Sequence, residues 1–321
     1  MINTSKLNEF VKGFAIGDAF GAGVEFQDRN WIAQNVDFKT FVNARSQIKV
    51  DNILPFIENY HPWNYTDDTE MLLAMIHLLN NEKEFTEDLI VKYIHSEYQK
   101  GIEKNGFGRN GHGSMSWYFN GSKTMDEIKS FQQNRPNPGN APCTRAVILG
   151  FLNESLINQF ATINANATHP HPKAIASSIV VARATYYFLN DISTDNIYDY
   201  CIEHIVDIET INHLKAVSKL PDFEKLTSAD FEILCGKQPI EPPMFLPGIN
   251  GLPSDALLTA GAILYILKYA ENAFDALKKS VLIGGDVDSL ASVCTGIFSP
   301  KYGLDSIPQF MLANVEKTVF D

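Results

Sequence analysis

Two acidic clusters, far apart in the chain, contain residues that could bind divalent metal ions. The first is Tyr65-Thr66-Asp67-Asp68-Thr69 and the second is Gly284-Gly285-Asp286-Val287-Asp288-Ser289. An apolar helical pattern follows each cluster, so each is predicted to begin a helix. If the fold brings the clusters together, four carboxylates and two hydroxyls meet in one place. Unpaired carboxylates are costly to bury unless cations neutralise them, so the pattern favours a metal site.

The ligand types narrow the choice of metal. Carboxylate and hydroxyl oxygens suit Mg²⁺, Mn²⁺ or Ca²⁺, whereas Zn²⁺ sites usually contain His or Cys, which both clusters lack. Magnesium or manganese is therefore expected. The alternative is that Asp67 and Asp286 are N-cap residues that accept hydrogen bonds from backbone amides, with Glu70 completing a capping box after Asp67. Capping explains two clusters of paired acids less easily than it explains one, and both interpretations can hold together.

Composition and charge limit the class of protein. The chain has 321 residues, of which 45% are hydrophobic, and its formal net charge is -12. This charge disfavours a nucleic-acid backbone or an anionic membrane as a partner, because both are polyanions. A small anionic ligand is compatible with it if metal ions or helix N-termini receive the ligand. The first ten residues are polar and no stretch approaches the roughly 20 apolar residues of a membrane span, so a cytoplasmic protein is expected.

Cysteine usage supports the same compartment. The four cysteines are widely spaced without a CxxC pair, which favours reduced, mostly buried thiols over a disulfide framework. Cys143 lies beside a loop rich in Gly and Pro, where a nucleophilic role is conceivable. That role is disfavoured because no activating partner is adjacent in sequence.

The elements that must position the acidic clusters are predicted to be helices. Apolar residues recur at steps of three and four residues over 7–14, 71–79, 175–184 and 257–267, and alternating strand patterns are scarce. Apolar runs at 277–283 and 290–297 flank Gly284-Gly285, which predicts two helices joined by a tight turn with Asp286 at the second helix start. Segments 26–63 and 134–142 are candidate site loops, and 221–253 is expected to be irregular. We find no repeat or linker, so one compact all-α domain over residues 1–321 is expected.

Five segments of the chain form a series of motifs. The first is Gly13-Phe14-Ala15-Ile16-Gly17-Asp18-Ala19-Phe20-Gly21-Ala22-Gly23-Val24-Glu25-Phe26. The other four are Thr66-Asp67-Asp68-Thr69, Ala167-Thr168-His169-Pro170-His171-Pro172, Gly284-Gly285-Asp286-Val287-Asp288-Ser289 and Tyr302-Gly303-Leu304-Asp305-Ser306-Ile307-Pro308. In this order the segments resemble those of the ADP-ribosylglycohydrolases, the family that contains dinitrogenase reductase-activating glycohydrolase, and the first is similar to the opening helix and loop of that family. The resemblance covers most of the chain.

The resemblance implies an orthogonal bundle of helices that holds two Mg²⁺ ions, with Mn²⁺ as a substitute, in a cleft that binds ADP-ribose. The substrate would be ADP-ribose linked to a protein side chain or a small molecule, and the bond hydrolysed would join C1″ to that acceptor. One ion would be bound by Thr66, Asp67 and Asp68, the other by Asp286 and Ser289, and Asp288 would touch both. The implied catalytic residues are Glu25, Asp67 and Asp288.

Two further acids near the start of the chain acquire roles through the resemblance. Glu25 matches a family glutamate near the metals and the scissile bond, where a carboxylate can order water or assist proton transfer. Without the resemblance, a single glutamate after a helix of small residues is usually a solvated loop residue. Asp18 lies inside a Gly- and Ala-rich helical run, so it is expected to be buried near the site and to support it through hydrogen bonds.

The resemblance also implies a substrate-binding set, which comprises Phe107, Gly108, Asn137, Gly139, Asn140 and His169. Glycine permits close backbone approach, and amides can meet phosphate oxygens. The chain departs from the family after Asn140, where Ala141-Pro142-Cys143-Thr144-Arg145 replaces a glycine, a small residue, Met and Arg, and again at Val287, which replaces a frequent Thr or Ser. Zinc bound by His169 and His171 is disfavoured, because no Cys or acidic partner lies nearby in sequence.

Three functions fit these observations. The first is a Mg²⁺-dependent ADP-ribosyl hydrolase, the second another di-metal hydrolase such as a phosphoesterase, and the third a non-catalytic relative that binds ADP-ribose or is structural. Retention of Glu25 and the six presumed metal ligands favours an enzyme, because a structural protein gains nothing from a costly buried charge cluster. The acceptor, whether arginine, serine, an O-acetyl group or another, and the oligomeric state are not encoded in any motif found.

Overall fold

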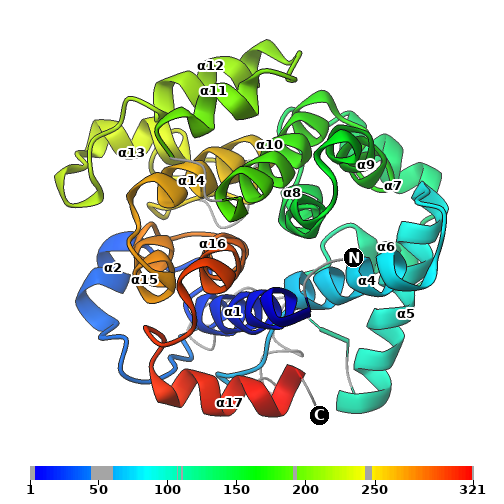
Figure 1. Cartoon of the computed structure of the whole chain (residues 1–321), viewed down its shortest axis with the longest axis horizontal. Helices are drawn as coiled ribbons and strands as arrows, with labels where there is room; N and C mark the ends of the chain where they lie inside the picture. The colour runs from blue at the N-terminus through cyan, green and yellow to red at the C-terminus, as the bar shows by residue number, and fades with distance from the viewer. Residues whose placement is uncertain are drawn as a thin grey trace. The chain divides into compact units, whose positions relative to one another are not determined.

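The fold is entirely helical in the part of the chain that the structure describes. In the computed structural model these residues are 4–44, 61–106, 108–109, 111–190, 194–242 and 248–319. Every regular element in these ranges is a helix, and the two isolated β-bridges within them both involve Gly285. Figure 1 shows this all-α architecture, which confirms the predicted fold class. No helix in these ranges is long and apolar enough to cross a membrane.

The helices fall into two compact units. Unit 1 comprises residues 1–65, 215–254 and 261–321, and unit 2 comprises residues 66–214 and 255–260. Unit 1 contains α1 (Thr4–Ala22), α2 (Arg29–Asn35), η4 (Phe223–Lys225), α13 (Ser228–Cys235), α15 (Ala273–Leu282), α16 (Val287–Tyr302) and α17 (Gln309–Val319). Unit 2 contains α4 (Asp67–Asn81), α5 (Glu87–Asn105), α6 (Met115–Phe119), α7 (Met125–Gln133), α8 (Ala141–Ala146), η2 (Val147–Phe151), α9 (Glu154–Asn166), α10 (Pro172–Leu189), η3 (Thr194–Asn196) and α11 (Ile197–Ile202). Two of the four unit boundaries fall inside helices, namely α12 (Ile208–Val217) and α14 (Ala256–Tyr269), and the single domain over 1–321 stays a prediction.

The core of unit 1 is built on the close pairing of α1 with α16, which lie side by side in Figure 1. Three glycines lie four residues apart in α1, at positions 13, 17 and 21. A Cβ at Gly13 would lie 2.0 Å from Ser299 Oγ, and one at Gly17 would lie 2.1 Å from the Ala291 carbonyl oxygen. Residues four apart share one helix face. The glycines therefore let the two backbones approach more closely than any side chain would allow, and α17 packs on α1 as well.

The core of unit 2 is centred on α10, which packs against α8, α9, α11 and η2. Most of its length is apolar and buried, and Ile179, Val180 and Ala184 of the predicted helical pattern are among the buried side chains. A helix that is apolar on most of its circumference is typical of the centre of a helical protein. Around it, α4 packs on α5 and α8.

The predicted helices at 7–14, 71–79, 175–184 and 257–267 lie within α1, α4, α10 and α14, and the helix–turn–helix around Gly284 is present as α15 and α16. The segment at 221–253 is more ordered than the sequence pattern suggested, because η4 and α13 lie in it and Thr227 begins α13 with a capping box. Thr227 accepts a hydrogen bond from Asp230 N, and Asp230 Oδ2 accepts one from Thr227 N. These reciprocal bonds satisfy amides at the helix start.

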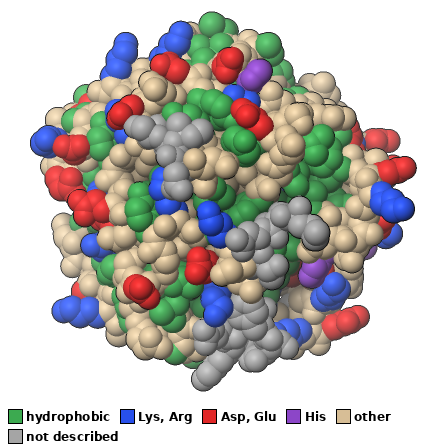
Figure 2. Space-filling view, in the orientation of Figure 1, with side chains coloured by type: hydrophobic (Ala, Val, Ile, Leu, Met, Phe, Trp, Pro, Cys, Tyr) green, Lys and Arg blue, Asp and Glu red, His purple; other side chains and the backbone are tan. Residues whose placement is uncertain are grey.

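The surface mixes charges of both signs. On the face in Figure 2, Lys and Arg side chains are interspersed with Asp and Glu side chains.

The four cysteines are all free and buried, as predicted from their spacing. Burial raises the pKa of the Cys235 thiol to about 12, so this thiol is protonated and unreactive at neutral pH.

Candidate functional site

The Gly284-Gly285 turn ties three segments of unit 1 together. Gly285 O accepts a hydrogen bond from Phe26 N at 2.7 Å, and Gly284 O accepts one from Leu252 N at 2.8 Å. Both glycines have positive φ angles, of 75° and 80°, which side chains disfavour. A Cβ on Gly285 would also lie 2.1 Å from Leu252 O. Glycine is therefore required here, and the turn places Glu25 beside the start of α16.

Three carboxylates meet at this turn. The side chains of Glu25, Asp286 and Asp288 each offer an oxygen atom such that these atoms all lie within 4.8 Å of one another. Asp286 and Asp288 are buried, at 3% and 4% exposure, and Glu25 is partly exposed. Like charges this close repel one another, and oxygen ligands at this spacing suit a hard divalent cation. The donor set thus fits Mg²⁺ or Mn²⁺ on chemical grounds.

Capping does not account for the acids of this group. Asp286 occupies the N-cap position of α16, as predicted, but its side chain makes no capping hydrogen bond. Asp288 Oδ1 accepts a hydrogen bond from the adjacent Ser289 N at 2.9 Å, which orients that carboxylate at the helix start. The glycine turn and the α1–α16 pairing therefore fix the position of these carboxylates. Capping of free backbone amides at the helix start does not explain it.

Helix α1 fixes the other side of this carboxylate group. A Cβ on Gly21 would lie 2.5 Å from Asp288 Cα, so the last turn of α1 rests directly on the backbone of the second acidic cluster. Phe26 follows Glu25 with φ 57°, an unfavourable angle for an aromatic residue that the hydrogen bond to Gly285 holds in place. Asp18 is fully buried in α1, as predicted.

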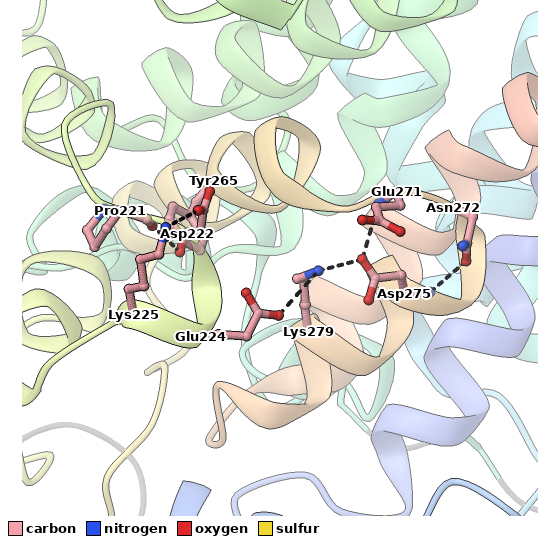
Figure 3. Close-up of polar contacts among 9 residues, drawn as sticks. All are labelled: Pro221, Asp222, Glu224, Lys225, Tyr265, Glu271, Asn272, Asp275 and Lys279. Atoms are coloured by element: carbon pink, nitrogen blue, oxygen red, sulfur yellow. Dashed lines mark hydrogen bonds and ion pairs between the residues drawn. The ribbon is translucent and has the colours of Figure 1, made fainter.

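Helix α15 leads into the glycine turn and is anchored near its C-terminal end. Figure 3 shows Lys279 between two acids, with its Nζ atom 2.5 Å from Asp275 Oδ2 and 3.8 Å from Glu224 Oε1. Asn272 caps the other end of the helix by accepting a hydrogen bond from Asp275 N. In the same view Tyr265 donates a hydrogen bond to the carbonyl of Pro221. These contacts connect η4, α14 and α15 and so support the turn that follows.

The first acidic cluster begins α4 in unit 2. The N-cap residue is Thr66, whose hydroxyl accepts a hydrogen bond from Asp68 N at 3.4 Å, and Asp67 is the first helical residue. The alternative that Asp67 is an N-cap is therefore wrong. Asp67 and Asp68 are buried, and a Cβ on Gly111 would lie only 1.8 Å from Asp67 Oδ1. Gly111 has a φ of 105°, so both conformation and space demand glycine beside this carboxylate.

Glu70 supports the same end of α4 in a way the sequence did not reveal. Its Oε2 atom lies 2.6 Å from His112 Nε2, and Arg109 Nε lies 3.8 Å from its Oε1 atom. All three side chains are buried. The alternative of a capping box from Asp67 to Glu70 is thus wrong, because Thr66 is the N-cap and Glu70 instead contacts the loop that carries Gly111. No sequence signal pairs Glu70 with a histidine 42 residues later.

The candidate ligand loop of unit 2 is fixed against the first turn of α14. Pro138 O accepts a hydrogen bond from Ala256 N at 3.0 Å, and Asn140 Nδ2 donates to Thr259 Oγ1 at 3.2 Å. Asn137 Nδ2 lies 3.3 Å from Asp255 Oδ2 in the amide orientation that satisfies both groups. A short segment rich in helix breakers therefore has a defined shape.

His169 faces this loop. A Cβ on Gly139 would lie 3.1 Å from His169 Nε2, so the missing side chain leaves room beside the imidazole. On the other side of the ring, Nδ1 lies 2.8 Å from Thr168 Oγ1, which accepts a hydrogen bond from Arg145 Nη2 at 2.8 Å. The structure thus brings together four of the predicted substrate-binding residues: Asn137, Gly139, Asn140 and His169.

Burial lowers the pKa of His169 well below its usual value, and the nearby charges of Arg145 and Arg135 lower it further. The ring is therefore neutral at pH 7. The Nε2 atom of this neutral ring faces Gly139.

The remaining predicted residues have different positions. A Cβ on Gly108 would lie 2.4 Å from the Tyr98 ring, so this glycine packs on α5, and Phe107 lies outside the described residues. His171 is the N-cap of α10, where it accepts a hydrogen bond from Lys173 N at 3.1 Å. Both imidazoles thus have structural partners.

Comparison with known proteins places this architecture in a family. The family model for ADP-ribosylglycohydrolase matches residues 4–321. The chain therefore belongs to the ADP-ribosylglycohydrolase family, as its motifs indicated. It is accordingly an enzyme of the glycoside-hydrolase type, and ADP-ribose conjugates are the substrates that the family implies.

Individual relatives are distant but extend over most of the chain. ADP-ribosylhydrolase ARH3 of Homo sapiens is 21% identical over 338 residues, which cover 95% of this chain and 87% of that protein. ADP-ribosylhydrolase ARH3 of Gallus gallus is 22% identical and covers 83% of this chain and 81% of its own length. A solved structure described as an ADP-ribosylglycohydrolase-related protein complex has a TM-score of 0.63 at 19% identity, with 98% of both chains covered. The last likeness shows the shared fold.

Proposed function

We propose that this protein hydrolyses the C1″ glycosidic bond between ADP-ribose and an acceptor, with two Mg²⁺ ions as cofactors and Mn²⁺ as a substitute. The observation that carries the proposal is the group of Glu25, Asp286 and Asp288, whose oxygen atoms lie within 4.8 Å of one another in a chain of this family. Water is the second substrate. The four free, buried cysteines support a reducing compartment, and we place the enzyme in the cytoplasm.

The metal ligands in this proposal are the oxygen atoms of both acidic clusters. Asp286, Asp288 and Ser289 begin α16 and Thr66, Asp67 and Asp68 begin α4, so helix starts supply all six residues. Asp288 is assigned to both ions. When bound, Mg²⁺ supplies Lewis-acid chemistry at substrate oxygens and neutralises the carboxylates. Buried acids of like charge would otherwise destabilise the folded state, which supports metal as their counter-charge.

The chain's own groups divide the remaining tasks. Glu25 is the most exposed member of its carboxylate group, so it can reach a water molecule and accept a proton from it. The neutral His169 and the loop at Asn137, Gly139 and Asn140 bind ADP-ribose through hydrogen bonds. Glu70, with His112, holds Gly111 against Asp67, which keeps that carboxylate in one orientation.

A panel of linkages tests the reaction. The protein is incubated with arginine-linked, serine-linked and O-acetyl ADP-ribose, each with Mg²⁺ or with EDTA, and released ADP-ribose is quantified. We expect release from at least one substrate with Mg²⁺ and loss of release in EDTA. Asp288→Asn should be inactive, whereas Glu84→Gln, which removes an exposed acid, should retain wild-type activity. Binding of ADP-ribose without cleavage of any substrate would favour a non-catalytic relative, and full activity in EDTA would contradict the metal role.

A further inference from the structure

The backbone at Gly251 and Leu252 lies directly against the glycine turn that precedes α16. A Cβ on Gly251 would lie 2.3 Å from Gly285 N, so only glycine allows this approach. Leu252 N donates a hydrogen bond to Gly284 O, and Leu252 O accepts one from Asp286 N, both at 2.8 Å. The segment formed by Gly251 and Leu252 therefore holds the backbone of Asp286, a member of the carboxylate group.

The side-chain amide of Gln238 pairs with Gly251 as the backbone of a neighbouring strand would. Gln238 Oε1 accepts a hydrogen bond from Gly251 N at 2.6 Å, and Gln238 Nε2 donates one to Gly251 O at 3.0 Å. The same nitrogen lies 3.2 Å from Gly236 O and 3.1 Å from Lys237 O. One side chain thus binds both backbone polar groups of Gly251, which requires an acceptor and a donor in this order.

Arg29 fixes the orientation of this amide. Its Nη2 atom donates a hydrogen bond to Gln238 Oε1 at 2.6 Å, and a bond from a charged donor is stronger than one between neutral groups. The guanidinium also lies over the ring of Phe231 in α13, 3.7 Å from the centroid, which holds the side chain in place. Because two donors meet at Oε1, the amide cannot turn over without directing an N–H group at a cation.

Asp28 and Asn250 join the same segments beside Arg29. Asp28 Oδ2 accepts hydrogen bonds from Asn250 N and Asn250 Nδ2, both at 2.8 Å. Asn250 O in turn accepts a hydrogen bond from Arg29 N at 2.9 Å, and a Cβ on Gly284 would lie 2.7 Å from that nitrogen. The chain that follows Glu25 is thus tied to the segment that supports the glycine turn.

We infer that Arg29 and Gln238 are positioning residues for the metal-binding carboxylates: Arg29 orients the Gln238 amide, and this amide holds Gly251 against the turn before α16. This inference rests on the proposed function. Both residues act through the backbone at Gly251 and Leu252 and take no part in the chemistry. Replacement of a group that orients metal ligands typically changes metal affinity or activity by about 10-fold to 100-fold.

Gln238→Glu is the sharpest test. Glutamate has the same shape and can still accept hydrogen bonds from Arg29 and Gly251 N, but it has no hydrogen atom for Gly251 O, so two oxygen atoms would face each other. We expect the Kd of Mn²⁺, measured from free Mn²⁺ by electron paramagnetic resonance, to rise about 10-fold to 100-fold. An added negative charge by itself attracts a cation, so the expected change is opposite to the long-range electrostatic effect.

Gln34→Glu is the matched control. Gln34 is exposed on α2, and the substitution adds the same charge to unit 1 away from the Gln238 amide. Because solvent and salt screen an exposed charge, the Kd of Mn²⁺ should stay within about threefold of the wild-type value. All proteins are compared well below their melting temperatures, so that global unfolding does not alter the Kd.

Two substitutions of Arg29 keep the test independent of Gln238→Glu. Arg29→Met removes the hydrogen-bond donor and keeps an unbranched side chain against Phe231, so we expect the Kd of Mn²⁺ to rise as in Gln238→Glu. Arg29→Lys keeps a cationic donor and should recover part of this loss. A role in packing alone predicts no such recovery, so equal losses in the two Arg29 variants would contradict the orienting role of the cation.

Hydrogen exchange provides a measurement that does not require metal. In metal-free protein, peptides that contain Asp286 should exchange faster in Gln238→Glu and Arg29→Met than in the wild type or Gln34→Glu. If the wild type binds Mn²⁺ and these two variants fold but retain its Kd, the inference is overturned. A wild type that binds no Mn²⁺ would refute the proposed metal site. Unchanged exchange would then overturn the inference as well, whereas faster exchange would retain the support of the turn by Gln238.

Discussion

At the scale of single residues, the proposed function depends on acidic side chains whose burial costs free energy. Asp286 and Asp288 are almost fully buried and lie with Glu25 in one group of oxygen atoms. The family resemblance assigns Glu25 to the handling of water and does not include it among the metal ligands. The geometry places it close enough to serve either purpose, so kinetics and metal binding must be measured together.

Glu25→Gln separates these roles. Glutamine keeps the size of the side chain but removes its basicity, and general acid–base groups contribute on the order of 10²–10⁴ in rate. We expect turnover to fall by that factor, while the Kd of ADP-ribose changes by less than about tenfold, which corresponds to about 1.4 kcal/mol. Turnover is measured with the substrate that the linkage panel identifies, and the Kd by calorimetry.

The Glu84→Gln enzyme is again the control, since it loses an exposed glutamate of unit 2. Near-normal turnover of Glu25→Gln on every substrate would refute the assignment of Glu25. A large rise in the Kd of Mg²⁺ in the same variant would show that Glu25 is chiefly a metal ligand.

At the scale of elements, the site in unit 1 depends on how closely α1 and α16 approach. Gly13, Gly17 and Gly21 occupy one face of α1, and Gly21 contacts the backbone at Asp288. The pairing therefore does more than bury apolar surface. It sets the distance between the segment that carries Glu25 and the start of α16, where Asp286 is the N-cap.

Gly17→Ala tests the pairing. Alanine favours an isolated helix over glycine by about 1 kcal/mol, but here its methyl group would lie 2.1 Å from the carbonyl oxygen of Ala291. The helices must separate, so we expect a net loss of about 1–3 kcal/mol in the free energy of unfolding, measured with urea. Asn8→Ala, at an exposed position of the same helix, should be neutral or slightly stabilising. Stabilisation by Gly17→Ala would mean that the close approach is absent in solution.

At the scale of the whole molecule, the acidic character of the chain makes metal binding a determinant of stability. The formal net charge is -12, and both acidic clusters contribute buried carboxylates. A cation that binds the folded state alone stabilises it by mass action, by about 2.7 kcal/mol at a concentration of 100 times Kd.

Thermal unfolding with and without Mg²⁺ or Mn²⁺ measures this linkage. We expect millimolar metal to raise the Tm of the wild type and to have little effect on Asp288→Asn. Without metal, the variant should be as stable as the wild type or more so, because one repelling charge is gone. A wild-type Tm that is insensitive to metal would count against the site, and a full metal response in Asp288→Asn would refute its bridging role. Glu84→Gln should respond as the wild type does.

The sequence by itself determined the helical class, the main helices and the residue types at the site. Periodicity at α1, α4, α10 and α14 is a local property, and so is the positive φ that Gly284 and Gly285 adopt before α16. The sequence predicts Asp286 at a helix start because the flanking apolar runs and the glycine pair are local features as well. Motif order then identified the family, which the match over residues 4–321 confirmed.

Tertiary structure alone decided which groups meet across long separations in the chain. It brought Glu25 to Asp286 through hydrogen bonds at Gly285, paired Glu70 with His112, and placed His169 beside Gly139. The local sequence does not predict these contacts, because the partner of each side chain depends on how distant parts of the backbone pack. Glu70 is an example: Thr66 is the N-cap of α4, so Glu70 is the fourth helical residue, and only the packing of a distant loop brings His112 to it.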